Sequence, residues 1–127
     1  MKRILLALGL TTLAVLSVAC SGASGPKPSA PTGSAVDGPT IVAKDLKFTT
    51  TSVEVKADSN VTIHLDNQDS APHNIAVYTD SGAGTPIAIG DVVTSTKSDL
   101  VVPALKPGSY FFRCDVHHDM TGTIVAK

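Results

Sequence analysis

Apolar and polar residues alternate along short stretches of this chain, as they do in strands that are buried on one face. Residues 53–58 read Val-Glu-Val-Lys-Ala-Asp, and residues 61–66 read Val-Thr-Ile-His-Leu-Asp. Turn-forming residues separate the two stretches, and similar short stretches follow at intervals of about ten residues. No segment shows a sustained helical period. The pattern predicts an all-β fold, a sandwich of antiparallel strands.

Further strands are expected at 75–77, at 100–102 and in the two stretches 109–114 and 122–126. Gly and Pro punctuate the chain between them, with Pro107-Gly108 forming a turn before the last strand pair. The remaining segment before residue 100 fits neither the strand nor the helix pattern. The prediction is therefore a series of short strands without an internal repeat.

The first forty residues have a different character from this β-type region. Residues 1–19 combine Lys2 and Arg3 with an apolar stretch, which is typical of a signal peptide for export. Residues 20–39 are rich in Gly, Ser, Pro and Ala and are expected to form a disordered linker. A linker of this length spans about 25 Å as a random coil. Residues 40–127 form the predicted folded domain.

Cys20 closes the apolar stretch directly after small residues, and this arrangement resembles a bacterial lipobox. On that resemblance the signal would be cleaved before Cys20, and a lipid on its sulfur would anchor the exported protein at the extracytoplasmic side of the cell membrane. Ser17 departs from the leucine usually found three residues before such a cysteine. The alternatives are an uncleaved anchor helix, cleavage after Ala19 without lipidation, and a disulfide from Cys20 to Cys114.

Composition excludes several classes of function for a chain of 127 residues. A formal charge of −1, aromatic residues at 4% and the absence of Trp argue against a nucleic-acid partner. The length allows one domain of ordinary size and no second catalytic domain. The domain is expected to be a monomer.

The residues that carry chemistry are Cys114, His117 and Met120 near the C-terminus and His73 upstream. A thiolate, two imidazoles and a thioether around one point form the ligand set of a blue copper site. A short loop can bring the first three together, and the second imidazole must come from elsewhere. His118, adjacent to His117, is an alternative ligand, and a structural zinc ion would accept the same Cys and His residues.

Other interpretations of single residues stay open at this point. Met120 could be a gap-filling core residue rather than a ligand. His64 alternates with apolar neighbours, so its side chain is expected on the solvent face of a strand. Tyr110 and Phe112 share the parity of Cys114 along their strand, and part of this aromatic group is expected in the core.

These residues resemble the cupredoxin family over essentially the whole of residues 40–127. The resemblance rests on Pro72-His73-Asn74, on the segment 105–114 that ends in Phe-Phe-Arg-Cys, and on Cys114-x2-His117-x2-Met120. The spacing is similar to the short ligand loop of amicyanins rather than to the longer loops of plastocyanins. The resemblance implies a cupredoxin-like Greek-key sandwich.

The resemblance also implies roles for single residues. His73, Cys114 and His117 would be equatorial ligands of one copper ion, and Met120 would be the axial ligand. Asn74 would tie the His73 loop to the Cys114 loop. Family members often have Pro where this chain has His118.

The function implied is electron transfer between transient redox partner proteins at the cell envelope, without enzymatic activity. Multicopper enzymes need further histidine clusters, and this chain has four histidines in total. The alternative is a module that stores, delivers or senses copper.

Overall fold

The computed structural model describes residue 28 and residues 31–127, so Cys20 and the predicted signal peptide lie outside the described residues. Every regular element in the described part is a strand, and no helix there is long and apolar enough to cross a membrane. The strands are β1 (Val36–Lys44), β2 (Lys47–Phe48), β3 (Ser52–Val55), β4 (Val61–Asn67), β5 (Pro72–His73), β6 (Ala76–Tyr78), β7 (Pro86–Ile89), β8 (Val93–Thr94), β9 (Lys97–Val102), β10 (Gly108–Arg113) and β11 (Thr121–Ala126).

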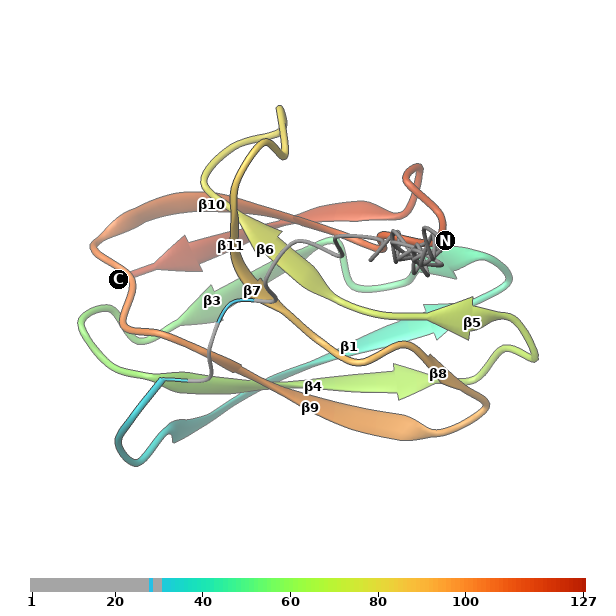
Figure 1. Ribbon diagram of the computed structural model, residues 1–127, viewed down its shortest axis with the longest axis horizontal. Coiled ribbons are helices and arrows are strands. Elements are labelled where there is room, and N and C mark those ends of the chain that lie inside the picture. The colour runs from blue at the N-terminus through green and yellow to red at the C-terminus, as the bar shows by residue number, and fades with distance from the viewer. Residues whose placement is uncertain (1–27, 29–30) are drawn as a thin grey trace, which may run out of the picture.

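The strands form two facing sheets and a small ribbon (Figure 1). One sheet has the order β2-β1-β4-β9, the other has the order β3-β11-β10-β6-β7, and β5 pairs with β8. The predicted all-β sandwich is confirmed. Most pairings are antiparallel, but β1 with β4 and β3 with β11 are parallel. The first parallel pair arises because the chain passes through β3 in the opposite sheet before it returns as β4.

The alternation along the sequence is visible in the burial of the strands. Along β4 the side chains at 61, 63, 65 and 67 are buried and those between them are half-buried, and β3 alternates in the same way. β1 begins at Val36, inside the segment that composition assigned to the linker, because Val36 and Asp37 pair with the start of β4. The unassigned segment before residue 100 contains β7, β8 and the start of β9.

The core lies between the two sheets and is centred on Phe112 of β10. Its ring is fully buried and lies 5.4 Å from the Phe48 ring, centroid to centroid. Burying an aromatic or branched side chain of this size stabilises the fold by roughly 1.5–3 kcal/mol. Gly122 allows the close approach of β11, since a Cβ there would lie 2.2 Å from a carbon of the Phe112 ring. β10, which directly precedes Cys114, is thus packed closely against β11 and also pairs with β6 on its other side.

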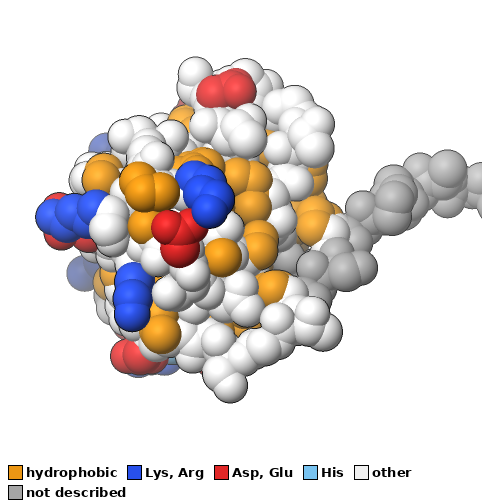
Figure 2. Space-filling model, turned by 90° about the vertical axis from the view of Figure 1, so that its left-hand side faces the viewer, with side chains coloured by type: hydrophobic (Ala, Val, Ile, Leu, Met, Phe, Trp, Pro, Cys, Tyr) orange, Lys and Arg blue, Asp and Glu red, His pale blue; other side chains and the backbone are white. Residues whose placement is uncertain are grey.

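The two ends of the sandwich differ in what their loops carry. The end that holds the C-terminus faces the viewer in Figure 2, which shows Lys side chains beside acidic ones over an otherwise mixed surface. Lys106 pairs with Asp58 at 2.8 Å and Lys127 pairs with Glu54 at 2.7 Å. Such exposed pairs contribute little to stability. At the other end lie β5, β8 and the loop between β10 and β11 (Figure 1), which contain the predicted ligands.

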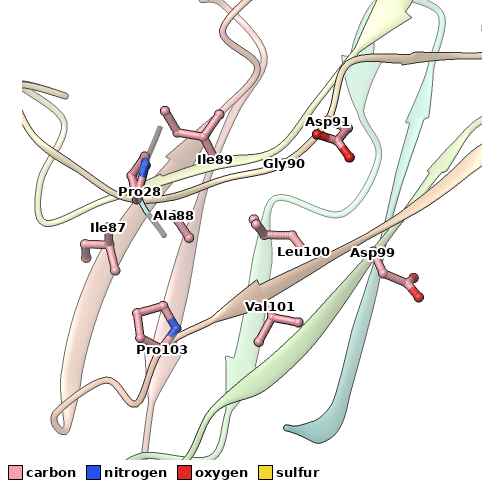
Figure 3. A pocket seen from close by; sticks show the side chains of 10 residues that line it. All are labelled: Pro28, Ile87, Ala88, Ile89, Gly90, Asp91, Asp99, Leu100, Val101 and Pro103. Atoms are coloured by element: carbon pink, nitrogen blue, oxygen red, sulfur yellow. The ribbon is translucent and has the colours of Figure 1, made fainter. Parts of the chain in front are cut away.

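A groove of about 360 Å³ lies between the edge strands β7 and β9 (Figure 3). Apolar side chains such as Ile87 and Leu100 line most of it, and Pro28 lies against it. None of its lining residues is a predicted ligand. The groove therefore lies apart from the predicted ligands, at the edges of β7 and β9.

Candidate metal centre

Three of the predicted ligands meet at one end of the sandwich. His73 is the last residue of β5, Cys114 directly follows β10, and His117 lies in the loop before β11. Their ligand atoms lie within 4.8 Å of one another, and His73 and Cys114 are fully buried. The Cys114 Sγ atom lies 3.8 Å from His73 Nδ1 and 4.0 Å from His117 Nδ1. Both imidazoles thus turn the same nitrogen toward one buried thiol.

These separations fit a shared metal ion. Metal bonds of about 2.3 Å to sulfur and about 2.0 Å to nitrogen, at a trigonal angle, put the two ligand atoms about 3.7 Å apart. The observed 3.8 and 4.0 Å are close to that separation. A hydrogen bond between the thiol and one imidazole would bring only one Nδ1 atom close to Cys114, whereas two are close to it. The donor set therefore fits a trigonal thiolate-and-imidazole site.

Met120 is brought back to this site by the backbone of its own loop. Its amide donates to the His117 carbonyl at 3.0 Å, and its carbonyl accepts from the Cys114 amide at 2.9 Å. The Met120 side chain is 2% exposed. The loop is thus closed by two hydrogen bonds, and the four residues His73, Cys114, His117 and Met120 are arranged as a copper site. A closed loop of this kind limits how far the ligands can move.

The two adjacent histidines of the loop point in different directions. His117 is half-buried and turns Nδ1 toward Cys114, while its ring lies 4.8 Å from the His73 ring, centroid to centroid. His118 is exposed, and its Nε2 lies 3.1 Å from the Asp115 carbonyl oxygen. The geometry thus favours His117 as the ligand and leaves His118 at the surface of the loop.

Asn74 connects the two ligand-bearing segments. Its Oδ1 accepts from the Asp115 amide at 2.8 Å, and its Nδ2 donates to the Gly90 carbonyl at 3.3 Å. The side chain is 1% exposed, so these bonds are shielded from water. They fix the chain just after His73 against the chain just after Cys114.

Asp69 is a functional candidate that the sequence analysis missed. Its Oδ2 accepts from His73 Nε2 at 3.0 Å, on the side of the ring opposite to Cys114. The Leu46 amide, above all, holds the pKa of the Asp69 carboxyl below its usual value, with smaller contributions from the Asp45 amide and His73. The spacing of four residues between Asp69 and His73 was visible in the sequence. Nothing in the sequence alone showed that the loop would fold the carboxylate back onto the ring.

A polar cluster lies on the other side of the Cys114 loop. Tyr78 donates to Asp115 Oδ1 at 2.7 Å, and Arg113 Nε donates to the same oxygen at 2.9 Å. Burial raises the pKa of Tyr78, and the Asp115 carboxylate adds to this effect. The Arg113 guanidinium also lies over the Tyr78 ring, 5.0 Å from its centroid. These contacts hold the first residue of the ligand loop in place.

Cys114 is a free thiol, and His64 lies apart from the site. His64 points to the outer face of β4, as predicted, where Nδ1 contacts Asp99 at 2.7 Å and Nε2 contacts Asp37 at 2.9 Å. Both carboxylates raise its pKa, Asp99 more than Asp37. With both ring nitrogens taken by carboxylates, His64 offers no free ligand atom.

The comparison with known proteins agrees with this geometry. The chain matches the family described as "Cupredoxin-like domain" over residues 9–126. It belongs to the cupredoxin-like family. No curated protein sequence matches the chain.

Solved structures show the same fold. Auracyanin B shares 16% identity with a TM-score of 0.69, covering 77% of this chain and 94% of its own. Auracyanin A, a "blue" copper protein from the bacterium Chloroflexus aurantiacus, shares 21% with a TM-score of 0.62, covering 71% and 100%. Amicyanin from Paracoccus versutus shares 23% with a TM-score of 0.56, covering 82% and 94%. At these identities the likeness establishes the fold of this cupredoxin-like chain.

Proposed function

We propose that this cupredoxin-like protein is a type 1 (blue) copper protein that carries electrons and performs no chemistry on a substrate. The observation that carries the proposal is the buried Cys114 thiol with two imidazole Nδ1 atoms at 3.8 and 4.0 Å. His73 and His117 would hold one copper ion through their imidazoles, Cys114 through its thiolate and Met120 through its thioether. When bound, copper supplies a reversible one-electron couple.

The chain's own contribution is to hold these ligands still. His73 lies in β5, which pairs with β8, and Cys114 lies at the end of a strand that is paired on both sides. The loop hydrogen bonds of Met120 fix the fourth ligand. Because the fold holds these ligand residues in place, little of the protein would rearrange on transfer of an electron. This property favours electron transfer over copper storage, which would call for a site that releases its metal.

The surface beside the site suits short-lived contacts with redox partners. The side chains of Leu46, Val92 and Val116 are 54%, 53% and 43% exposed. Val116 precedes His117, Val92 precedes the strand that pairs with His73, and the Leu46 amide shares the Asp69 carboxylate with His73. Exposed apolar side chains around a half-buried ligand give a partner a small, dry point of approach.

The tether proposed from Cys20 is compatible with this arrangement. The Thr32 carbonyl accepts from Asn60 Nδ2 at 3.4 Å, and the Val36 amide donates to the Asn60 carbonyl at 2.8 Å. The domain therefore begins at the end of the sandwich that is remote from the ligand loop (Figure 1). An exported chain with a lipid on Cys20 would thus be attached to the membrane through the end of the sandwich that is remote from the predicted ligands. A mature protein that carries no lipid on Cys20, as measured by mass spectrometry, would contradict the lipid anchor.

The copper site is tested by adding cupric ion to the purified protein. We expect an intense visible absorption from charge transfer between the Cys114 thiolate and copper, and a Cys114→Ser protein should lack it. His117→Ala should lose the colour, whereas His118→Ala, its neighbour in the same loop, should keep it. If the Cys114→Ser protein kept the band, or the wild type never showed it, the blue copper assignment would be wrong.

Measurements on the copper-bound protein can then distinguish an electron carrier from a module that stores or delivers copper. A carrier should show a reversible potential and fast electron self-exchange, because its ligands are already in place in both states. A storage or delivery module should instead release copper readily to a competing chelator. A colourless protein that binds zinc in the same place would indicate a structural zinc site.

A further inference from the structure

Asp69 is the meeting point of three hydrogen bonds that no other carboxylate in the described part of the chain combines. Its Oδ1 accepts from the Asp45 amide at 2.7 Å, and its Oδ2 accepts from the Leu46 amide at 3.0 Å. The same Oδ2 accepts from His73 Nε2 at 3.0 Å. The side chain is 14% exposed, so water competes only weakly for these bonds.

We propose that Asp69 is the positioning residue of the metal site, which fixes the tautomer and orientation of His73 and ties that ring to the exposed turn at Asp45 and Leu46. The inference deepens the proposed function and rests on it, since it concerns how this chain prepares one of its copper ligands.

The tautomer follows from the chemistry of the carboxylate. A neutral imidazole carries its proton on one ring nitrogen only, and an ionised carboxylate can accept but not donate. Asp69 therefore requires the proton on His73 Nε2. The Nδ1 lone pair is then free on the side of the ring that faces Cys114 Sγ, 3.8 Å away. A second hydrogen-bond partner of this kind commonly sets which nitrogen of a histidine binds metal.

The turn is held by the same group. Asp45 and Leu46 both have left-handed backbone conformations, with φ of 54° and 56°, which non-glycine residues adopt at a cost. Two successive amides that point into one carboxylate form an anion-binding concavity. The Asp69 carboxylate compensates for the unfavourable backbone of a turn that would otherwise relax.

The backbone of Asp69 is itself fixed. Its amide donates to Asn67 Oδ1 at 2.9 Å, and its carbonyl accepts from Ser95 Oγ at 2.8 Å. These two hydrogen bonds fix the backbone of Asp69 between the loops that precede β5 and β9. As a result, the Leu46 side chain, which a partner could touch, and the His73 ring, which would hold the metal, are linked through one group.

Asp69→Asn is the test, because no orientation of an amide satisfies all three donors. If the Asn oxygen accepts from the Leu46 amide and His73, its NH2 group faces the Asp45 amide. If the amide is turned, its NH2 group faces His73 Nε2 and favours the wrong tautomer. Asp66→Asn is the matched control, since Asp66 lies in the preceding strand and contacts Gln68 and Lys97 rather than a ligand.

The first measurement uses the copper-free protein and nitrogen NMR of the histidine rings at about pH 8, where an ordinary imidazole is neutral. We expect His73 to carry its proton on Nε2 in the wild type and in Asp66→Asn, and to shift toward the Nδ1 tautomer in Asp69→Asn. Amide exchange should rise only in Asp69→Asn, at Asp45 or at Leu46, whichever amide loses its acceptor. A wild-type His73 protonated on Nδ1 would overturn the proposal without any variant.

The second measurement adds copper. Asp69→Asn should bind copper about 10–100-fold more weakly and show an altered electron paramagnetic resonance spectrum, while Asp66→Asn should match the wild type. A folded Asp69→Asn protein with unchanged affinity, spectrum and tautomer would refute the positioning role. A wild type that never turns blue would instead refute the proposed function, whatever its tautomer. The two failures are therefore distinguishable.

Discussion

Two histidines of this protein contact carboxylates, and they do so in opposite ways. His73 is buried, gives one ring nitrogen to Asp69 and turns the other toward Cys114. His64 has a side chain that is 30% exposed and gives both nitrogens to carboxylates, Asp99 and Asp37. At His73 one carboxylate binds one ring nitrogen and leaves the other free to bind a metal. At His64 two carboxylates occupy both ring nitrogens.

The difference comes from where each histidine stands in its sheet. His64 occupies a half-buried position of β4, whose neighbours β1 and β9 bring Asp37 and Asp99 beside it. His73 ends a two-residue strand at the rim of the sandwich, where loops replace sheet neighbours on one side. An Asp–His contact therefore does not by itself define a metal site. The free nitrogen and the buried thiol beside it do.

Removal of His73 should change copper binding more than any other substitution considered for the two histidines. His73→Ala should abolish the blue band and the stabilisation that copper gives, whereas His64→Ala should keep both. Copper at about 100 times its dissociation constant should stabilise a competent protein by about 2.7 kcal/mol. Thermal unfolding with and without cupric ion measures this difference. Equal copper responses of the two variants would erase the contrast between the sites.

Sequence reasoning could reach the ligands because three of them lie in one short loop. Cys114, His117 and Met120 have a spacing that itself suggests a shared centre, and His73 upstream could supply the second imidazole. The resemblance already favoured His117 over His118, and the fold supports that choice, because the His117 ring turns toward the thiol and the His118 ring does not. Asp69 was hidden because its role depends on a turn at residues 45–46, far away in the sequence.

The fold was predictable to a similar degree. Alternation identified β3 and β4 because each buries one face, as their burial patterns show. The parallel pairing of β1 with β4 was not predictable, because it depends on how the chain crosses between sheets. β5 and β8 have two residues each, which is too short for any periodicity to appear. The partners of His64 were equally out of reach, since they come from different strands.

The contacts of His64 with two carboxylates should also make the stability of the folded protein depend on pH. Asp99, and to a lesser extent Asp37, raise the pKa of His64 in the folded protein above its ordinary value of 6.5. The stabilisation of the folded protein by the contacts of His64 with these carboxylates is therefore complete below the pKa of His64 in the unfolded chain. It disappears as the pH rises through the pKa of His64 in the folded protein. Compared with His64→Gln, the wild type should be more stable by at most about 1 kcal/mol at acidic pH, because the carboxylates are exposed.

Chemical denaturation of both proteins at about pH 5.5 and at about pH 9, on either side of the histidine range, measures this effect. The other three histidines are common to both proteins, so their titration cancels in the difference. A stability difference that grew with rising pH would contradict the proposed ion pairs.

Asp99 and Asp37 should differ slightly in how strongly they raise the pKa of His64. The Asp99 contact is the shorter, at 2.7 Å against 2.9 Å, and the Asp99 side chain is 65% exposed against 91% for Asp37. Less water around a closer carboxylate means a stronger interaction with the imidazolium. Asp99→Asn should therefore lower the pKa of His64 more than Asp37→Asn does, as followed by proton NMR of the His64 ring. Each variant should change stability by only a few tenths of a kcal/mol, as exposed pairs do.

If Asp37→Asn had the larger effect, the start of β1 rather than β9 would be the stronger partner of His64. The contrast with the single, buried carboxylate at His73 would then need a different explanation from solvent exposure.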